Sequence, residues 1–237
     1  MTFSGRTALV VGASRGIGAA VARDLAGAGA RLALVARSAA ALDALVQELG
    51  QHHIALSCDV TDGPAVTAMA THFAAWADGA PDILVCSHGI FALVPADAQD
   101  PEEFARTVDV NLVAPFRVIR AFLGAMRARR SGDIVMIGSV SDRHSFAGNA
   151  AYGASKFGVR AMLEVIRAET RGSGVRASIV SPGPVDTAAW DAYESQLGES
   201  LPLRAEMLRA GDVARAVHAV LVQPAHVVID ELRLSHA

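Results

Sequence analysis

The chain has 237 residues, 52% hydrophobic and 19% charged, which excludes a disordered protein and fits one large α/β domain with a buried core. The formal net charge of −3 shows no basic surplus and argues against nucleic acid as a partner. The apolar runs have the length of strands, far short of the roughly 20 residues that span a membrane, so we expect no membrane contact. The N-terminal stretch enters a strand without a charged region before it, so we expect no signal peptide and a cytoplasmic location.

Short apolar runs alternate along the chain with longer segments of helical character. The runs predict strands over residues 7–11, 31–36, 54–57, 83–86, 133–137, 175–180 and 227–234. The segments between them predict helices from the first glycine turn to about residue 29, over 39–49, from about 63, over 101–129, over about 149–171 and over about 212–222. Residues 188–210 are less regular, and long irregular segments beside a site are often lids, so we expect a substrate-binding lid there.

The predicted strands are apolar on both faces and alternate with helices. This pattern favours a doubly wound α/β fold, in which a parallel sheet carries helices on both sides. Ligands of such sheets bind at the carboxyl ends of the strands, where the strand order reverses. No linker, repeat or second domain is evident, so residues 1–237 are expected to form a single Rossmann-type domain.

The two cysteines, Cys58 and Cys86, lie at the ends of predicted strands that are three spacings apart in the expected sheet. At about 4.8 Å per spacing the separation is roughly 14 Å, whereas a disulfide needs Cα atoms within about 7 Å. Two free thiols are therefore expected. Neither cysteine has a metal-ligand partner at a suitable spacing, so no metal site is expected.

A glycine turn follows the first strand, with Gly12, Gly16 and Gly18 at its corners. Glycines let the backbone approach a phosphate, and the free N–H groups and dipole of the following helix favour an anion. The spacing is G-x-x-x-G-x-G rather than G-x-G-x-x-G. A glycine triplet alone is a weak signal, since many are only tight turns, but its place between a strand and a helix favours a dinucleotide site.

The end of the second strand indicates which dinucleotide would bind. NAD-binding units place an acid there for the ribose 2′-hydroxyl, but this chain has Ala36 and Arg37, with Asp43 and Glu48 only in the next helix. Arg37, together with Arg15 in the glycine turn, would face a doubly charged 2′-phosphate. The pattern favours NADP(H), and the alternative is that Arg37 is an ordinary solvated arginine at a helix start.

The stretch after the fifth strand carries the residues that point to catalysis. Tyr152 and Lys156 are four residues apart and share one helix face, and Ser139 stands at the strand exit. An ammonium about 4 Å from a phenol stabilises its phenolate form by roughly 4 kcal/mol at an effective dielectric of 20. Such a tyrosine can exchange a proton with a carbonyl or alcohol oxygen, and the serine hydroxyl could hold the same oxygen. A lone Y-x-x-x-K is nevertheless common on amphipathic helices.

Two further positions have competing readings. Asp59, after the third strand, would lie beside an adenine, or either Asp59 or Asp62 is the N-cap of the helix that starts near residue 63. Asn111 lies mid-helix four residues before Pro115, which cannot donate a hydrogen bond to the Asn111 carbonyl. That carbonyl could hold a water molecule, or the kink there is only structural.

Taken together, these residues resemble the short-chain dehydrogenase/reductase family over nearly the whole chain. The marks in order are Gly12, Gly16, Gly18, Asp59, Asn111, Ser139, Tyr152, Lys156, Pro182 and Gly183, with Val185 and Thr187. The resemblance implies one Rossmann sheet of seven strands in the order 3-2-1-4-5-6-7 and hydride transfer at a hydroxyl or carbonyl carbon. It also implies homotetramers or homodimers packed through the long helices that begin near residues 101 and 149.

The resemblance implies a role for each matching residue. Tyr152 would be the general acid or base, Lys156 would assist it and bond the nicotinamide ribose, and Ser139 would orient the substrate oxygen. Asn111 would hold a water that links Lys156 to solvent. The residues expected to bind the cofactor are Gly12, Ser14, Arg15, Gly16, Ile17, Gly18, Arg37, Asp59, Val60, Ser87, Gly89, Tyr152, Lys156, Pro182, Gly183, Val185 and Thr187.

The chain departs from the family pattern in two places. The usual Asn-Asn-Ala-Gly after the fourth strand is Cys86-Ser87-His88-Gly89, and the lost asparagine usually steadies neighbouring strands. His88 would be a proton donor near the cofactor or would only fill space. The C-terminal stretch, VVIDELRLSHA, lacks the Gly-Gly often found there.

The expected function is an NADP(H)-dependent oxidoreductase that interconverts a carbonyl and a secondary alcohol on a small to medium, fairly apolar substrate. The alternatives are an NAD-dependent alcohol dehydrogenase and a catalytically silent dinucleotide-binding protein. The residues that point to an apolar substrate are Trp190, Tyr193, Leu197 and Met207 in the lid, with His144, Phe146, Phe91 and Leu93 as further walls; all could equally be core or subunit interface.

Overall fold

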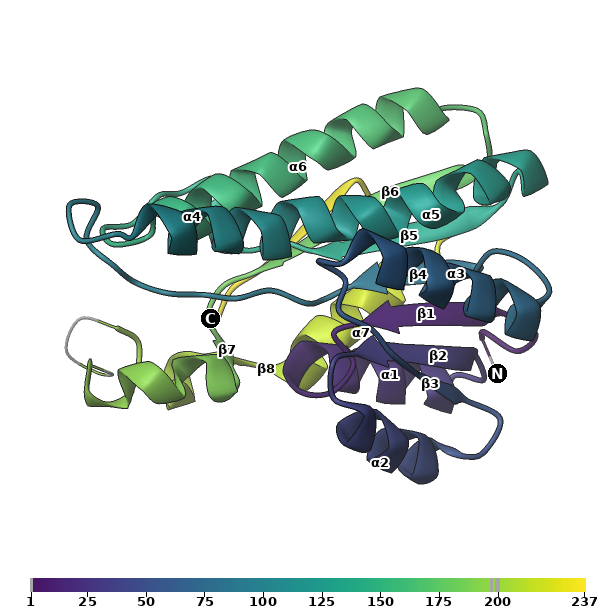
Figure 1. Ribbon diagram of the computed structural model, residues 1–237, viewed down its shortest axis with the longest axis horizontal. Coiled ribbons are helices and arrows are strands. Elements are labelled where there is room, and N and C mark those ends of the chain that lie inside the picture. The colour runs from purple at the N-terminus through teal and green to yellow at the C-terminus, as the bar shows by residue number, and fades with distance from the viewer. Residues whose placement is uncertain (1, 197, 199–200) are drawn as a thin grey trace.

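The computed structural model describes residues 2–196, 198 and 201–237. Its main sheet has seven parallel strands in the order β3-β2-β1-β4-β5-β6-β9, which confirms the predicted topology (Figure 1). The strands are β1 Thr7–Val11, β2 Arg31–Ala36, β3 Ile54–Ser57, β4 Ile83–Cys86, β5 Gly132–Ile137, β6 Val175–Pro182 and β9 Glu231–Leu234. Leu197, expected to line the lid, lies outside the described residues.

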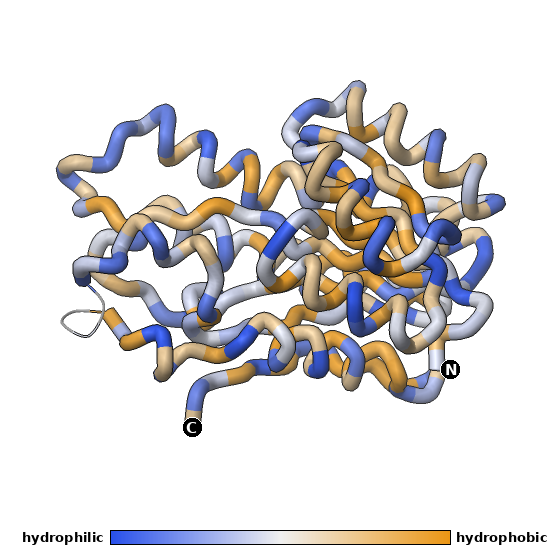
Figure 2. The backbone as a smooth tube through the Cα atoms, turned by 90° about the horizontal axis from the view of Figure 1, so that it is seen from below, coloured by the Kyte–Doolittle hydropathy of each residue, from blue (hydrophilic) through white to orange (hydrophobic). Residues whose placement is uncertain are grey.

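Helices cover both faces of the sheet, as the doubly apolar strands require (Figure 1). One face carries α1 Gly16–Gly27, α2 Ala39–Leu49 and α7 Ala210–Leu221, and the other carries α3 Gly63–Ala77, α4 Pro101–Val108, α5 Ala114–Arg129 and α6 Ala150–Thr170. Alternate residues of β1 enter the two cores: Leu9 packs with α3, α5 and α6, and Val10 packs with α1, α2 and α7. Figure 2 shows the hydrophobic colour densest where the strands run through the interior.

Local sequence signals fix several helix starts. Ser38, Asp62 and Asp100 are the N-caps of α2, α3 and α4, and each side chain accepts a hydrogen bond from a first-turn N–H. Asp59 is not a cap; its carboxylate accepts hydrogen bonds from the backbone N–H (3.0 Å) and the hydroxyl (2.7 Å) of Thr61. Of the two aspartates considered for the start of α3, the cap is therefore Asp62.

The long helix predicted over 101–129 is interrupted by one π-helical turn, Asp109–Val113, between α4 and α5. The N–H of Ala114 reaches back five residues to the carbonyl of Asp109, and Pro115, at the start of α5, has no N–H to donate. The prediction of a disturbance at Asn111 is thus confirmed, in the form of a widened turn.

The last strand is shorter than predicted. It begins at Glu231 rather than at residue 227. The Arg176 guanidinium donates hydrogen bonds to the carbonyl oxygens of Gln223, Pro224 and Val227, and the N–H of Val227 donates to the Pro224 carbonyl. These bonds hold a turn that ends at Val227, the residue where the strand was predicted to begin.

The irregular segment 188–210 contains more structure than its sequence suggested. It holds two 3₁₀ helices, Ala188–Gln196 and Arg204–Glu206, and the strand β8 Leu208–Arg209, which pairs with β7 Val185–Asp186. Within the part of the chain that the structure describes, no helix combines the length and apolarity needed to cross a membrane.

Candidate active site

The glycine turn after β1 is shaped for close approach of another group. Gly12 and Gly16 have φ of +84° and +56°, a region that favours glycine. A Cβ on Gly18 would lie 2.1 Å from the Gly12 carbonyl oxygen, and one on Gly12 would lie 2.7 Å from the backbone nitrogen of His88. Arg15, the residue at the N-cap position of α1, makes no side-chain hydrogen bond to the N–H groups of the first turn. This open cradle of donors suits a pyrophosphate, so the residues present fit a dinucleotide.

Two arginines stand at the entrance to this cradle. Arg15 immediately precedes α1 and Arg37 immediately follows β2, and both side chains are exposed. Across residues 2–196, 198 and 201–237, neither guanidinium is in an ion pair, and no carboxylate stands at the end of β2. Both charges are therefore available to an anionic ligand.

Tyr152 and Lys156 lie on one face of α6 near its N-terminus. The Lys156 Nζ is 5.5 Å from the centroid of the Tyr152 ring and donates a hydrogen bond to the Ile137 carbonyl at 3.0 Å. Lys156 is 5% exposed and Tyr152 is half-buried. The ammonium is thus held out of bulk water beside the phenol, where its charge is screened least.

The π-helical turn places Asn111 behind this pair. Its carboxamide accepts a hydrogen bond from the Ile90 N–H (2.8 Å) and donates to the Ile90 carbonyl (2.9 Å) and to the Ser155 hydroxyl (3.1 Å). A Cβ on Gly89 would lie 3.2 Å from the Asn111 Oδ1 and 3.9 Å from the Lys156 Nζ. The Asn111 side chain therefore ties the loop after β4 to α6, a contact that its sequence position alone did not predict.

Ser139 stands at the exit of β5 and is 8% exposed. Its Oγ accepts a hydrogen bond from the Ser141 N–H at 3.1 Å, which leaves the hydroxyl hydrogen free to donate. Asp142, fully buried, anchors the same loop: it accepts a hydrogen bond from Ser181 of β6 and lies 3.2 Å from the Arg143 Nε. The loop of the serine and the strand end before Pro182 are thereby fastened together.

One of the residues that replace the family's Asn-Asn-Ala still links neighbouring strands. Ser87 donates a hydrogen bond from its hydroxyl to the Val11 carbonyl at 2.7 Å, so β4 and β1 remain linked at their ends. The ring nitrogens of His88 are buried and have no hydrogen-bond partner among the described residues. Burial, and then the Lys156 ammonium, lower the pKa of His88 to about 4, so the imidazole is neutral at pH 7. A neutral, enclosed imidazole favours the interpretation that His88 fills space.

Residues of the lid meet the site through aromatic side chains. The Phe91 ring packs against the rings of Tyr152, Trp190 and Tyr193, with centroids 5.0, 5.3 and 5.7 Å away. Thr187 faces the glycine turn, since a Cβ on Gly16 would lie 3.4 Å from its methyl group. The segment predicted to be a lid therefore reaches Tyr152 only through the Phe91 ring, and Thr187, just before that segment, lies next to the cradle.

Arg204 stabilises the conformation of the segment that was predicted to be a lid. Its guanidinium binds the carboxylates of Asp186 (2.7 Å), Asp191 (2.8 Å) and Glu194 (2.6 Å), and donates to the Thr187 carbonyl at 3.3 Å. One arginine thus joins the end of β7 to the first 3₁₀ helix.

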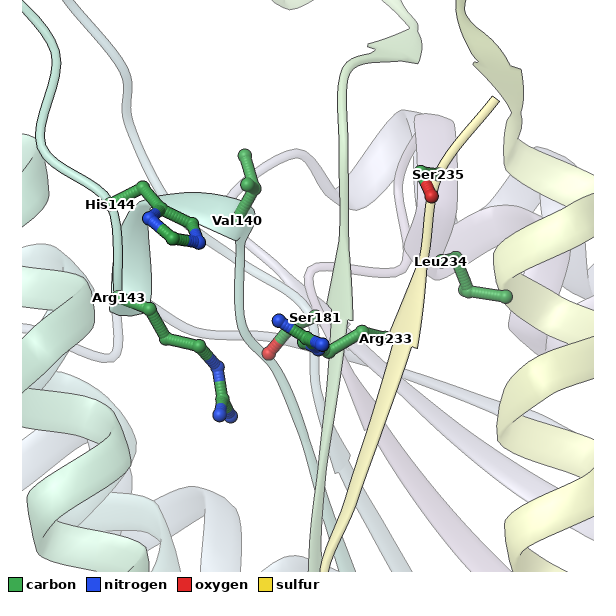
Figure 3. A pocket seen from close by; sticks show the side chains of 7 residues that line it. All are labelled: Val140, Arg143, His144, Ser181, Arg233, Leu234 and Ser235. Atoms are coloured by element: carbon green, nitrogen blue, oxygen red, sulfur yellow. The ribbon is translucent and has the colours of Figure 1, made fainter. Parts of the chain in front are cut away.

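Two cavities border the site. One, of about 290 Å³, opens between the loop after Ser139 and the end of β9 and is lined by Val140, Arg143, His144, Ser181, Arg233, Leu234 and Ser235 (Figure 3). The other, of about 220 Å³, lies toward the start of α4; its lining includes Phe91 and Tyr152. His144 therefore belongs to the cavity next to the C-terminal strand, while Phe91 and Tyr152 share the other.

Comparison with known proteins shows the family of the chain. A family model described as short chain dehydrogenase matches residues 6–198. The chain belongs to the short-chain dehydrogenase/reductase family. D-threitol dehydrogenase from Mycolicibacterium smegmatis is 35% identical over 96% of this chain and 92% of its own length. A glycine betaine reductase from Emericella nidulans is 38% identical over 97% of this chain. That protein is much longer, and the match covers only 18% of its length.

Solved structures of short-chain dehydrogenases share the fold. A metagenomic short-chain oxidoreductase in complex with NADP has a TM-score of 0.83 and 32% identity, with 99% of each chain covered. The closed form of a serine dehydrogenase complexed with NADP+ has a TM-score of 0.87 and 29% identity, covering 96% of this chain and 93% of that one.

The contacts of this short-chain dehydrogenase that escaped prediction include the Phe91 ring on Tyr152, the Asp142–Ser181 hydrogen bond and the cluster around Arg204. For Arg204 the sequence did hold a signal. Asp186, Asp191 and Glu194 precede Arg204, and no lysine or arginine lies between them and Arg204. For Phe91 and Asp142 no spacing rule applies, because each contact joins a loop to an element far away in the sequence, α6 for Phe91 and β6 for Asp142.

Proposed function

We propose that this protein is an NADP(H)-dependent oxidoreductase that interconverts a carbonyl and a secondary alcohol by hydride transfer. The observation that carries the proposal is the buried Lys156 ammonium beside the Tyr152 phenol, at the sheet edge that also holds the glycine cradle. The two groups can transfer a proton where a dinucleotide would place its reactive ring.

The cradle is proposed to bind the pyrophosphate and the arginines the 2′-phosphate of NADP(H). Gly12, Gly16 and Gly18 would admit the phosphates, and Arg15 and Arg37 would meet the additional phosphate. The remaining residues that we assign to cofactor binding are Ser14, Ile17, Asp59, Val60, Ser87, Gly89, Tyr152, Lys156, Pro182, Gly183, Val185 and Thr187. Two structural neighbours crystallised with NADP or NADP+ support this choice.

The bound nicotinamide supplies or accepts the hydride, and the protein handles the proton. In the reductive direction Tyr152 donates its phenolic proton to the carbonyl oxygen, and the Lys156 charge stabilises the phenolate that remains. Ser139, whose hydroxyl hydrogen is free, donates a hydrogen bond to the same oxygen. Asn111 is proposed to hold a water at its backbone carbonyl, which would return the proton from solvent through Lys156.

The substrate is proposed to be small to medium and fairly apolar. In support, the Phe91 ring packs on Tyr152, the lid residues Trp190 and Tyr193 pack on Phe91, and Arg204 of the lid is already neutralised by three carboxylates. We treat residues 188–210 as a substrate-binding lid within a single domain of residues 1–237. The relatives act on dissimilar compounds, as names such as D-threitol dehydrogenase and 3-oxoacyl-[acyl-carrier-protein] reductase show, so no one of them identifies the substrate.

Association into homotetramers or homodimers is proposed to occur through α5 and α6. Phe116 on α5 and Phe157 and Val165 on α6 are 46%, 41% and 57% exposed. Exposed large apolar side chains on neighbouring helices are typical of subunit interfaces.

The proposal is tested with a panel of ketones and alcohols, following NADPH consumption or formation by absorbance. Turnover of at least one carbonyl with NADPH, much weaker with NADH, is expected. Equal use of NADPH and NADH would favour the NAD-dependent alternative, and NADPH binding without turnover of any compound would favour a silent binding protein.

A further inference from the structure

Phe91 lies at the centre of an aromatic cluster that includes the proposed catalytic residue. It follows β4 in a loop, is half-buried, and meets Tyr152 edge to face at an interplanar angle of 82°. Trp190 and Tyr193 of the lid also contact the Phe91 ring, and the centroids of these two lid rings are 6.4 Å apart. One phenyl ring therefore fills the space that three other rings enclose.

The surroundings of Phe91 are fastened by hydrogen bonds to the backbone. Ile90, before it, is clamped at both its N–H and its carbonyl by Asn111. The Leu93 N–H, after it, donates to the Tyr193 hydroxyl at 2.8 Å, and the Trp190 Nε1 donates to the Val185 carbonyl at 3.1 Å. The loop and the lid rings are thus held in fixed positions relative to one another, so the Phe91 ring occupies a defined position.

Phe91 also forms a wall of the cavity of about 220 Å³ toward α4. Tyr152 lines this cavity as well, whereas Trp190 and Tyr193 do not. The ring of Phe91 therefore stands between the lid aromatics and an empty space that already reaches Tyr152. A shorter side chain at position 91 would join that space to the region under the lid.

We propose that Phe91 determines substrate specificity by limiting the size of the group that a substrate can place beside Tyr152. This inference rests on the proposed carbonyl–alcohol chemistry at Tyr152. It assigns to the natural protein a preference for carbonyl compounds with small substituents, and to position 91 the control of that preference.

The test compares two methyl ketones that share the reacting group and differ only in the substituent: butan-2-one and 2-acetonaphthone. The variants Phe91→Ala, Phe91→Leu and Phe91→Trp form a size series, assayed with NADPH. The kcat/KM ratio of the naphthyl to the ethyl ketone is expected to rise about tenfold or more in Phe91→Ala, to rise less in Phe91→Leu, and to fall in Phe91→Trp. Val228→Ala, an exposed position remote in sequence, should leave the ratio unchanged.

Folding of each variant is checked by NADPH fluorescence and thermal unfolding, and the Leu and Trp variants serve if Phe91→Ala does not fold. A ratio that stays constant across the series while both ketones are turned over would overturn the role of Phe91 and leave the proposed function standing. Absence of turnover of any carbonyl or alcohol by the natural protein would overturn both.

Discussion

Arg37 and Arg15 illustrate how single side chains select a ligand. The backbone of the glycine turn accepts any dinucleotide pyrophosphate, because its donors are N–H groups common to NAD-binding and NADP-binding proteins. The discriminating charge stands at the end of β2, where Arg37 is exposed and has no carboxylate neighbour in an ion pair among the described residues. A guanidinium there attracts a 2′-phosphate and offers a ribose hydroxyl no acceptor.

Replacing Arg37 by aspartate should therefore reverse the charge selection. In Arg37→Asp, kcat/KM for NADPH is expected to fall at least about a hundredfold, since a charge-assisted contact is lost and a repulsive one gained, while kcat/KM for NADH stays the same or rises. Steady-state kinetics with both cofactors and one ketone measure this. Parallel losses with NADPH and NADH would contradict the assignment of Arg37.

At the scale of whole elements, the strands of the main sheet could be predicted from the sequence, whereas the structure of several connecting segments could not. Strands such as β1 and β6 were predictable because runs that are apolar on both faces have few other structures available. The predicted start of β9 was wrong: Val227 closes a turn whose carbonyl oxygens accept hydrogen bonds from Arg176 of β6, and no local pattern encodes that contact. The π-helical turn had a local cause in Pro115 and was therefore foreseen as a disturbance.

The candidate site divides in the same way. Tyr152 and Lys156 could be paired from their spacing because a helix repeats its face every three to four residues. The bond between Tyr193 and Leu93 joins residues 100 positions apart, so only the packed fold brings it about. Contacts of this second kind, which include those of Phe91 and Asp142, shape the proposed substrate region, which the sequence alone does not define.

The edge strand β9 is linked to the serine-bearing loop by ion pairs of Glu231. Arg143 and, at 3.0 Å, Arg160 both bind its carboxylate. Burial raises the pKa of Glu231, but the hydrogen bond and charge of Arg143, with the charge of Arg160, outweigh it and hold the pKa below its usual value. A carboxylate with a lowered folded-state pKa stabilises the fold above its unfolded-state pKa, and this contribution is lost as the pH falls through the folded-state value.

Glu231→Gln should accordingly destabilise the protein in a pH-dependent manner. At pH 7 the free energy of unfolding is expected to fall by about 1 kcal/mol, and the difference from the natural protein should narrow as the pH drops below about 4.5. Urea denaturation across pH 3.5–7 measures both. Glu48→Gln, which removes an exposed partner of Arg23, is the matched control and should change stability less. A loss that is equal at every pH would contradict the ion-pair account.

At the scale of the molecule, the helices α5 and α6, which cover one face of the sheet, carry exposed apolar side chains on their outer faces. Phe116, Phe157 and Val165 expose large apolar surfaces on α5 and α6, while the inner faces of the same helices fill the core with residues such as Phe122 and Leu163. Helices that are apolar on two faces usually pack against something on both. A second copy of the chain would satisfy the outer face.

Charges introduced on that face should break the proposed assembly. The double variant Phe157→Glu with Val165→Glu is expected to lower the mass measured by light scattering to half or less of the natural value, because unpaired carboxylates cannot be buried in an apolar interface. Val228→Glu, on an exposed apolar residue outside these helices, should leave the mass unchanged. An undiminished oligomer in the double variant would place the interface elsewhere.

The central claim is that the phenol of Tyr152, held beside a buried ammonium, transfers the proton. The most direct measurement is the turnover of Tyr152→Phe with NADPH and a ketone that the natural protein reduces, together with its NADPH affinity. Phenylalanine keeps the ring that packs on Phe91 and removes only the hydroxyl. We expect an NADPH affinity within about threefold of the natural value and a kcat lower by about a thousandfold or more. A variant that binds NADPH and turns over at a near-natural rate would contradict it.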